Sequence, residues 1–262
     1  MKQMWQPARA LAPGALLALL LPLAACGSDD GGDGGSAGGD TTITVLAAAS
    51  LTDTFTALAE DFEAEHEGVS VKLAFDSSAT LAEQAVGGAP ADVLATADTA
   101  TMDDASEALA ADPQLFATNT MVLALPADNP AGITSYDDLG SGEVTYIVCV
   151  DTAPCGKVAA ALIESTGLTA EPSSLEVDVK AVLSKVITDE ADAGFVYATD
   201  AVAAGDAVTT VEIPGAAEQV TSYPIAPLVQ SGESGLAQEF VDLVLSEAGQ
   251  QTLANAGFGP PS

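Results

Sequence analysis

Residues 43–75 read ITVLAAASLTDTFTALAEDFEAEHEGVSVKLAF and contain one complete strand–helix–strand unit. The apolar run at 43–48 has the length of a strand. From 51 to 62 the apolar residues recur at helical spacing, with polar residues on the other face. Gly68 is typical of a helix end, and apolar and polar residues then alternate over 69–75, which predicts a second strand. The unit favours an α/β fold.

The rest of the chain repeats this alternation. We predict helices over 77–88, 102–110, 157–165, 179–189 and 239–256, and strands over 92–96, 120–125, 144–150, 195–197, 208–213 and 223–229. Strands that alternate with helices indicate parallel sheets with right-handed crossovers. In such sheets ligands lie beyond the carboxyl ends of the strands, at the amino ends of the helices that follow.

Composition limits the classes of function. The 262 residues allow one large or two modest domains, and 48% hydrophobic against 17% charged residues is enough for a core. The formal net charge of −32 counts against nucleic-acid binding and against docking on anionic lipid by charge. Charge alone suggests a cationic partner, such as a metal ion.

The first 40 residues are typical of a processing segment and a tether. A basic start and an apolar stretch at 10–25 predict a secretory signal peptide over residues 1–25, and the stretch is too short and interrupted to span a membrane. Residues 23–27, LAACG, resemble a bacterial lipobox, which implies cleavage before Cys26 and lipid attachment to its thiol. The alternative is an ordinary signal peptide with an incidental cysteine. Residues 27–40 are rich in Gly and Asp and predict a flexible tether.

Four junctions could place helix amino ends beside a ligand, at 48–51, 75–78, 153–156 and 178–180. A helix amino end has free N–H donors and about half a positive charge, so it suits an anion. Ser50 and Ser78 are also residue types that cap helices. Taken singly, each junction is better explained as a helix cap with no ligand.

Taken together, five motifs resemble the molybdate-binding proteins of ABC importers over about residues 41–258. The motifs are AAASLT at 47–52, FDSSATLA at 75–82, GAPADV at 88–93 with AD at 97–98, PCG at 154–156 and GFVYATDA at 194–201. The resemblance implies a two-lobed periplasmic-binding-protein-like fold with a ligand cleft between the lobes. It implies one lobe of residues 41–120 plus 224–262, a second of 121–223, and hinges near Thr120 and Tyr223.

The resemblance also implies a ligand set for a tetrahedral oxyanion. The donors would be the hydroxyls of Ser50, Ser78 and Tyr197 and the backbone amides of Cys155 and Val179, with Ala49 and Ser77 as secondary backbone donors. Such donors suit a fully ionised oxyanion, which only accepts hydrogen bonds. No Lys or Arg is required, because hydrogen bonds to an ionised group are already strong. The alternative for Tyr197 is a core aromatic residue whose hydroxyl is satisfied nearby.

Two residues depart from the family pattern. At Cys155 only the backbone is used, so a different side chain is tolerable, whereas Asp76 affects the charge of the site. Asp76 stands where a small neutral residue is commoner, and an ionised carboxylate facing the site would repel an anion. Alternation along the strand at 69–75 predicts that its side chain points away from the site.

By the same resemblance, the protein captures molybdate and also tungstate outside the cytoplasmic membrane, to which it is lipid-anchored. It delivers the anion to a permease with an ATPase, acts as a monomer, uses no cofactor and is not an enzyme. One alternative is the same scaffold binding another oxyanion such as sulfate. The other is a surface-anchored acidic metal binder or hydrolase, although His66 is the only histidine and no P-loop or Gly-x-Ser-x-Gly motif is present.

Two cysteines remain once Cys26 is lipidated. Cys149 and Cys155 flank the short loop at 150–154, between a predicted strand and a predicted helix start. Disulfides persist outside the cytoplasmic membrane, so we predict a Cys149–Cys155 disulfide that holds the loop supplying one ligand amide. Two buried thiols are the alternative.

Overall fold

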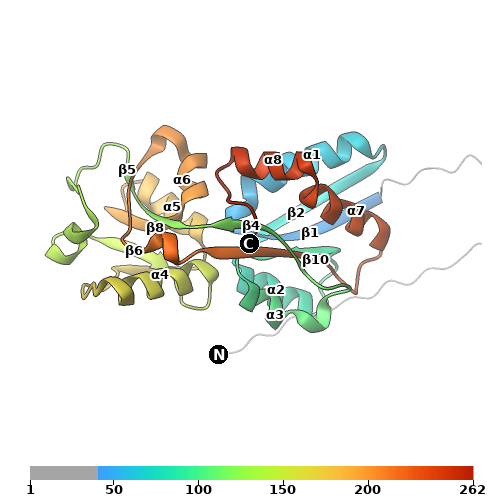
Figure 1. Ribbon diagram of the computed structural model, residues 1–262, viewed down its shortest axis with the longest axis horizontal. Helices are drawn as coiled ribbons and strands as arrows, with labels where there is room; N and C mark the ends of the chain where they lie inside the picture. Colours follow the sequence, from blue (N-terminus) through green and yellow to red (C-terminus); the bar gives the residue numbers. More distant parts are fainter. Residues whose placement is uncertain (1–40, 262) are drawn as a thin grey trace, which may run out of the picture. The chain divides into compact units, whose positions relative to one another are not determined.

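The computed structural model describes residues 41–261. The predicted signal peptide, Cys26 and the tether lie outside the described residues. The described part belongs to one compact unit and contains two five-stranded sheets, each with helices packed on it (Figure 1). The α/β prediction is therefore confirmed.

The first sheet has the strand order β2-β1-β3-β10-β4. Its strands are β1 (Thr41–Ala48), β2 (Val69–Asp76), β3 (Val93–Ala95), β4 (Gln114–Asn119) and β10 (Thr221–Pro227). One face packs on α1 (Thr52–Glu65), α7 (Ser234–Leu245) and α8 (Glu247–Asn255), and the other on α2 (Ser78–Val86) and α3 (Thr99–Asp104), as Figure 1 shows. Both faces are buried, which explains the nearly continuous apolar run in β1.

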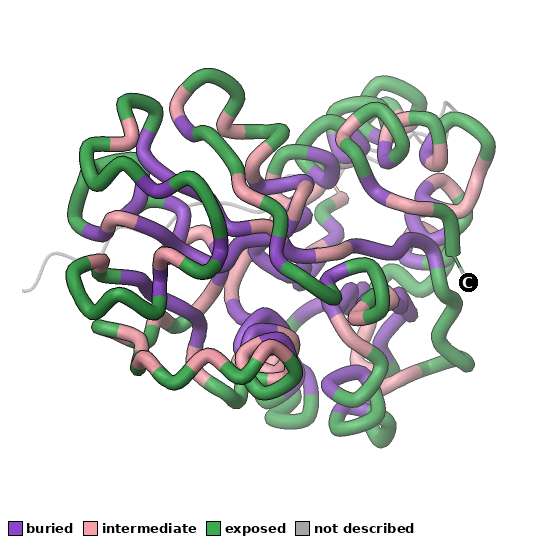
Figure 2. Tube along the Cα trace, turned by 60° about the vertical axis from the view of Figure 1, so that its left-hand side comes forward, coloured by how far each residue is buried: buried purple, intermediate pink, exposed green. Residues whose placement is uncertain are grey.

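The second sheet has the order β7-β6-β8-β5-β9. Its strands are β5 (Met121–Pro126), β6 (Tyr146–Cys149), β7 (Ser174–Glu176), β8 (Ala193–Tyr197) and β9 (Val208–Val211). The associated helices are α4 (Pro154–Thr166), α5 (Val179–Ile187) and α6 (Ala198–Ala204). A single apolar cluster joins this sheet to its helices. The buried segments in Figure 2 follow the strands, and the exposed segments follow the loops and outer helix faces.

Both sheets are mixed, so the prediction of parallel sheets was wrong in part. Strand β10 runs antiparallel to β3 and β4, and β5 runs antiparallel to β8 and β9. The reason is the chain path, because β4 passes directly into β5 of the other sheet without a crossover helix. The chain returns to the first sheet between β9 and β10.

These two crossings set the sheet boundaries. The first falls at Thr120, as predicted. The second lies between Val211 and Thr221, because β10 already pairs with β4 from Thr221 onward. The predicted boundary at 223/224 therefore falls inside β10, and residues 221–223 belong to the first sheet.

Several helix boundaries differ from the predictions, and α4 begins at Pro154 rather than at residue 157. The single helix predicted over 239–256 is two helices, α7 and α8, because extended Ser246 ends the first and its side chain accepts a hydrogen bond from the Gly249 amide to cap the second. The helix predicted over 102–110 begins earlier, at Thr99, because Asp98 caps it by accepting from the Thr101 amide. Strands β4 and β7 and helix α6 were not predicted.

Candidate functional site

A small cavity lies between the two sheets, at the carboxyl ends of their strands. Its volume is about 20 Å³, whereas pockets for drug-sized ligands measure ~300–1,000 Å³. The space is therefore far too small for an extended organic ligand. Every residue predicted to bind the ligand lines it, and the full lining is Ala48, Ala49, Ser50, Asp76, Ser77, Ser78, Ala97, Ala153, Pro154, Cys155, Asp178, Val179 and Tyr197.

Helix amino ends converge on this cavity from both sheets. From the first sheet, β1 leads through a short 3-10 helix (Ala49–Leu51) into α1, and β2 leads into α2. From the second sheet, α4, α5 and α6 follow β6, β7 and β8. The first N–H groups of each helix have no acceptor within the helix, so the local potential of the cavity favours an anion.

Two serine hydroxyls contributed by the first sheet are held by neighbours. The Ser78 Oγ atom accepts a hydrogen bond from the Ala97 amide at 3.0 Å, which leaves the hydroxyl proton of Ser78 available to another acceptor. The Ser50 Oγ atom lies 3.0 Å from the Tyr223 hydroxyl. Both serines are buried, so their hydroxyls face the cavity rather than bulk water.

The second sheet contributes backbone amides. Cys155 is the second residue of α4 and Val179 the first residue of α5, so neither N–H has an acceptor within its helix. The structure joins Cys149 to Cys155 in a disulfide. Gly156 has no room for a Cβ atom, because the Val150 carbonyl occupies that position. The loop and the start of α4 are thus packed tightly against each other.

Tyr197 carries a buried hydroxyl without a partner. The residue ends β8 and precedes α6, and its exposed fraction is 1%. Its hydroxyl has no partner among the described residues at ordinary hydrogen-bond distance, although the Tyr223 hydroxyl is near enough to influence its pKa. Burial raises the pKa of Tyr197 well above its ordinary value, so the group keeps its proton and can donate it. Because an unsatisfied buried hydroxyl costs free energy, this atom indicates a missing acceptor in the cavity.

Asp76 is among the residues that line the cavity, and the direction of its carboxylate relative to the ligand stays a prediction. Its Oδ1 atom accepts a hydrogen bond from the Ser77 amide at 2.7 Å. This contact turns the end of β2 and draws the carboxylate toward the start of α2. It also occupies the Ser77 N–H, which sequence analysis had offered as a secondary donor. Asp178 lines the cavity as well and caps α5, where its Oδ1 atom accepts from the Ala181 amide.

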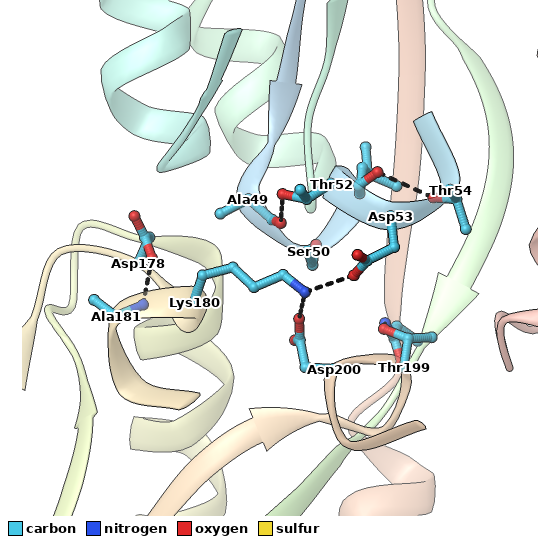
Figure 3. A network of polar contacts seen from close by, with 12 residues as sticks. Ala49, Ser50, Thr52, Asp53, Thr54, Asp178, Lys180, Ala181, Thr199 and Asp200 are labelled. Carbon is cyan, nitrogen blue, oxygen red and sulfur yellow. Dashed lines mark hydrogen bonds and ion pairs between the residues drawn. The ribbon is translucent and has the colours of Figure 1, made fainter. Parts of the chain in front are cut away.

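Lysines bridge the two sheets beside the cavity without lining it. The Lys180 Nζ atom lies 2.9 Å from Asp53 Oδ2 on α1 and 3.3 Å from Asp200 Oδ1 on α6, and Figure 3 shows its side chain reaching between the two carboxylates. The Lys157 Nζ atom on α4 lies 3.0 Å from Asp98 Oδ2 at the start of α3. Burial raises the pKa of Asp200 to about 6, against the opposing effect of Lys180.

Two residues near the site were missed by sequence reasoning. Tyr223, on β10, contacts Ser50, which is 173 positions away in the chain, and Asn119, at the end of β4, contacts both Tyr223 and Thr199. No local motif marks these residues, because their roles arise from strand pairing between distant segments. In residues 41–261, we found no group of three or more His, Cys, Asp or Glu side chains arranged to hold a metal ion.

Comparison with known proteins gives a consistent result. Residues 43–259 match the family of bacterial extracellular solute-binding proteins. The chain is 43% identical over 256 residues to the molybdate-binding protein ModA of Mycobacterium tuberculosis strain H37Rv, covering 96% of this chain and 98% of that protein. Among the helices that the structure describes, none combines the length and apolar character needed to cross a membrane.

Solved structures share the fold. The periplasmic molybdate-binding protein of Azotobacter vinelandii superposes with a TM-score of 0.75 at 20% identity, over 84% of this chain and all of that one. The sulfate-binding protein SubI of M. tuberculosis superposes with a TM-score of 0.72 at 20% identity, over 84% of this chain and 87% of that one. At these identities the likeness concerns the fold alone.

Proposed function

Because the chain belongs to the family of bacterial extracellular solute-binding proteins, we propose that it captures molybdate, and tungstate as well, for an ABC importer. The 43% identity to a molybdate-binding protein over nearly the whole of both chains supports this ligand. The protein performs no reaction and uses no cofactor. Its partners are a permease and the ATPase that drives it.

The chemistry of the cavity suits a fully ionised tetrahedral oxyanion. The oxygens of such an ion only accept hydrogen bonds, and we assign the donors to the Ser50, Ser78 and Tyr197 hydroxyls and the Cys155 and Val179 amides. Ser50 and Ser78 belong to the half built on the first sheet. Tyr197, Cys155 and Val179 belong to the half built on the second. An anion held by both sets favours the closed arrangement of the halves, because it binds that arrangement more strongly than an open one.

The single observation that carries the proposal is the Tyr197 hydroxyl. It is buried, it lines the cavity and it has no partner among the described residues. A structural tyrosine in a core normally satisfies its hydroxyl. An oxyanion in the cavity would supply the acceptor that this group lacks.

Isothermal titration calorimetry of the mature protein tests the ligand. Molybdate and tungstate should each bind at one site per chain, and sulfate, phosphate and calcium should be titrated alongside. Heat with calcium alone would contradict an oxyanion site. Tighter binding of sulfate than of molybdate would keep the site and change the ligand, which is the relevant competitor because the fold also serves a sulfate-binding protein.

We further propose that lipid on Cys26 anchors a monomer to the outer face of the cell membrane, with residues 27–40 as its tether. The lipobox-like LAACG at 23–27 supports this proposal. The protein expressed with its own leader should partition into the detergent phase of a Triton X-114 extraction, and Cys26→Ala should move it to the aqueous phase. Equal partitioning of both forms would contradict the anchor, and light scattering of the mature form measures the monomer.

A further inference from the structure

We propose that Tyr223 is a positioning residue that fixes the direction of the Ser50 hydroxyl proton and so makes Ser50 a donor toward the ligand. This inference rests on the proposed function and deepens it, because it concerns which oxyanions the same site accepts. It is carried by a buried chain of hydrogen bonds that runs from the Thr120 backbone to Ser50. Tyr223 does not itself line the cavity.

The chain of hydrogen bonds begins at a backbone N–H group, which can only donate. The Thr120 backbone N–H donates to Asn119 Oδ1 at 3.0 Å, which fixes the orientation of the Asn119 amide. The Asn119 Nδ2 atom then faces Thr199 Oγ1 at 2.8 Å and the Tyr223 hydroxyl at 3.5 Å. An amide NH₂ group can only donate, so the Tyr223 oxygen accepts from Asn119.

The proton of Tyr223 therefore has one acceptor. Among the described residues, the partners of the Tyr223 hydroxyl at ordinary hydrogen-bond distance are Asn119 Nδ2 and Ser50 Oγ, and Nδ2 cannot accept. The Tyr197 hydroxyl lies farther away and acts on Tyr223 as a donor rather than as an acceptor. The tyrosine ring is fully buried, and it packs edge-on against Phe116, Phe258 and Tyr197. Burial raises its pKa, so the hydroxyl stays protonated and donates to Ser50.

This arrangement leaves the Ser50 proton free for the cavity. Ser78 reaches the same state by a shorter route, since its oxygen accepts directly from the Ala97 amide. Both serine oxygens are thus already hydrogen-bonded acceptors, and both protons are available to a ligand. The two carboxylates at the cavity are held by other groups, because Asp76 Oδ1 accepts from the Ser77 amide and Asp178 Oδ1 from the Ala181 amide.

A site whose hydrogen-bond donors have fixed directions distinguishes an anion that carries a proton from one that carries none. Molybdate and sulfate are fully deprotonated near neutral pH and accept at every oxygen. Monohydrogen phosphate carries the same double charge but retains one P–OH proton, which opposes a donor that cannot turn around. Loss of the Tyr223 hydroxyl would free Ser50 to rotate and accept from that proton, so preference for molybdate over phosphate should narrow.

The test is Tyr223→Phe, with Tyr146→Phe as the matched control. Tyr146 is equally buried, and its hydroxyl donates to the Ala170 carbonyl, away from the cavity. At pH 8, Y223F should weaken molybdate binding about 3- to 10-fold, as expected for one hydrogen bond, while inorganic phosphate binding is unchanged or improved. Y146F should leave both affinities as in the wild type. Thermal unfolding of both variants measures the general cost of a lost buried hydroxyl.

A double-mutant cycle then asks whether Tyr223 acts through Ser50. In a Ser50→Ala background, Tyr223→Phe should change neither the molybdate affinity nor the ratio of phosphate to molybdate dissociation constants. Equal weakening of both anions by Y223F, or full additivity with S50A, would overturn the inference and leave Tyr223 as packing. Wild-type protein that fails to bind molybdate would instead contradict the proposed function, so the two failures are distinguishable.

Discussion

At the scale of the residue, the Tyr197 hydroxyl allows an effect on ligand binding to be distinguished from an effect on protein stability. Tyr197→Phe removes a group that has no hydrogen bond in the structure, so the free energy of unfolding should stay the same or rise. Binding of molybdate should weaken by roughly 1–3 kcal/mol, the cost of one hydrogen bond to an ion. Ser78→Ala should weaken binding to a similar extent.

Calorimetry and thermal unfolding together check this prediction. Tyr136→Phe is the control, because its hydroxyl bonds Thr166 at 2.9 Å away from the cavity. That variant should lose stability and keep its affinity. Normal affinity in both Y197F and S78A would mean that the anion lies elsewhere.

Asp76 predicts an effect of opposite sign. Asp76 lines the cavity, and two unit charges about 4 Å apart repel by about 1 kcal/mol even at the dielectric of bulk water, so a dianion beside its carboxylate is repelled by at least that much. Asp76→Asn keeps an oxygen that can accept from the Ser77 amide and removes the charge, so molybdate should bind at least about fivefold more tightly. Asp61→Asn, an exposed change on α1, should have no such effect. Weaker binding by D76N would show that the carboxylate helps to organise the site.

Residues differ in how far the sequence could place them. Ser50 and Ser78 were predictable because each stands at a strand-to-helix junction that is encoded locally. The hydrogen bond of Asp76 to the next amide was not, because it forms at the end of β2, where the chain turns into α2. The contact of Tyr223 with Ser50 could not be predicted, because it depends on the pairing of β10 with distant strands.

At the scale of the element, the same division holds. The βαβ unit at 43–75 was predicted closely because periodicity is a local property. Strand direction was not, because antiparallel β5 and β10 follow from where the chain crosses between the sheets. The break at Ser246 was missed because neither Gly nor Pro stands at 244–247, and only the serine cap separates α7 from α8.

The disulfide should stabilise the start of α4. It closes a short loop, with a sequence separation of 6, for which chain entropy gives about 2 kcal/mol of stability. A Cys149→Ala/Cys155→Ala variant should unfold at correspondingly lower denaturant concentration and bind molybdate more weakly, because the Cys155 amide is held less firmly. Dithiothreitol should lower wild-type stability and leave the variant unchanged. Insensitivity of both proteins to reductant would show that the loop is held by packing alone.

Asp200, in the first turn of α6, predicts a pH dependence. Burial raises its pKa from 3.8 to about 6, with Lys180 opposing and Asp53 adding to the shift. The native state therefore binds this proton more tightly than the unfolded chain, and the resulting stability is full below about pH 4 and lost as pH rises through about 6.

Asp200→Asn should remove that contribution. Relative to wild type, the variant should gain about 1–3 kcal/mol of unfolding free energy between pH 4 and pH 7. Asp206→Asn, at an exposed position just after α6, should differ from the wild type by the same unfolding free energy at every pH. Denaturant unfolding at several pH values measures these free energies. A difference that does not change with pH would mean that Lys180 fully compensates the buried carboxylate.

At the scale of the whole molecule, the charge of −32 opposes an anionic ligand over long range, while helix amino ends favour it locally. Two of the few lysines lie between the two halves, beside the cavity. Lys157 and Lys180 each begin on a helix of the second sheet and pair with an acid of the first, at Asp98 and Asp53. These ion pairs therefore connect the two halves of the molecule, each of which contributes some of the proposed ligand donors.

Such pairs should slow the opening of the closed state. Lys180→Gln and Lys157→Gln should each raise the dissociation rate of molybdate about two- to fivefold, since a partly exposed ion pair contributes up to ~1 kcal/mol. Lys185→Gln is the matched control, because it removes the same charge from the same helix as Lys180 but breaks a pair with Glu176 inside one half. The release of radiolabelled molybdate into excess unlabelled tungstate measures the rate. An equal acceleration by all three variants would assign the effect to the overall field, whereas acceleration confined to the two bridging lysines would assign it to closure.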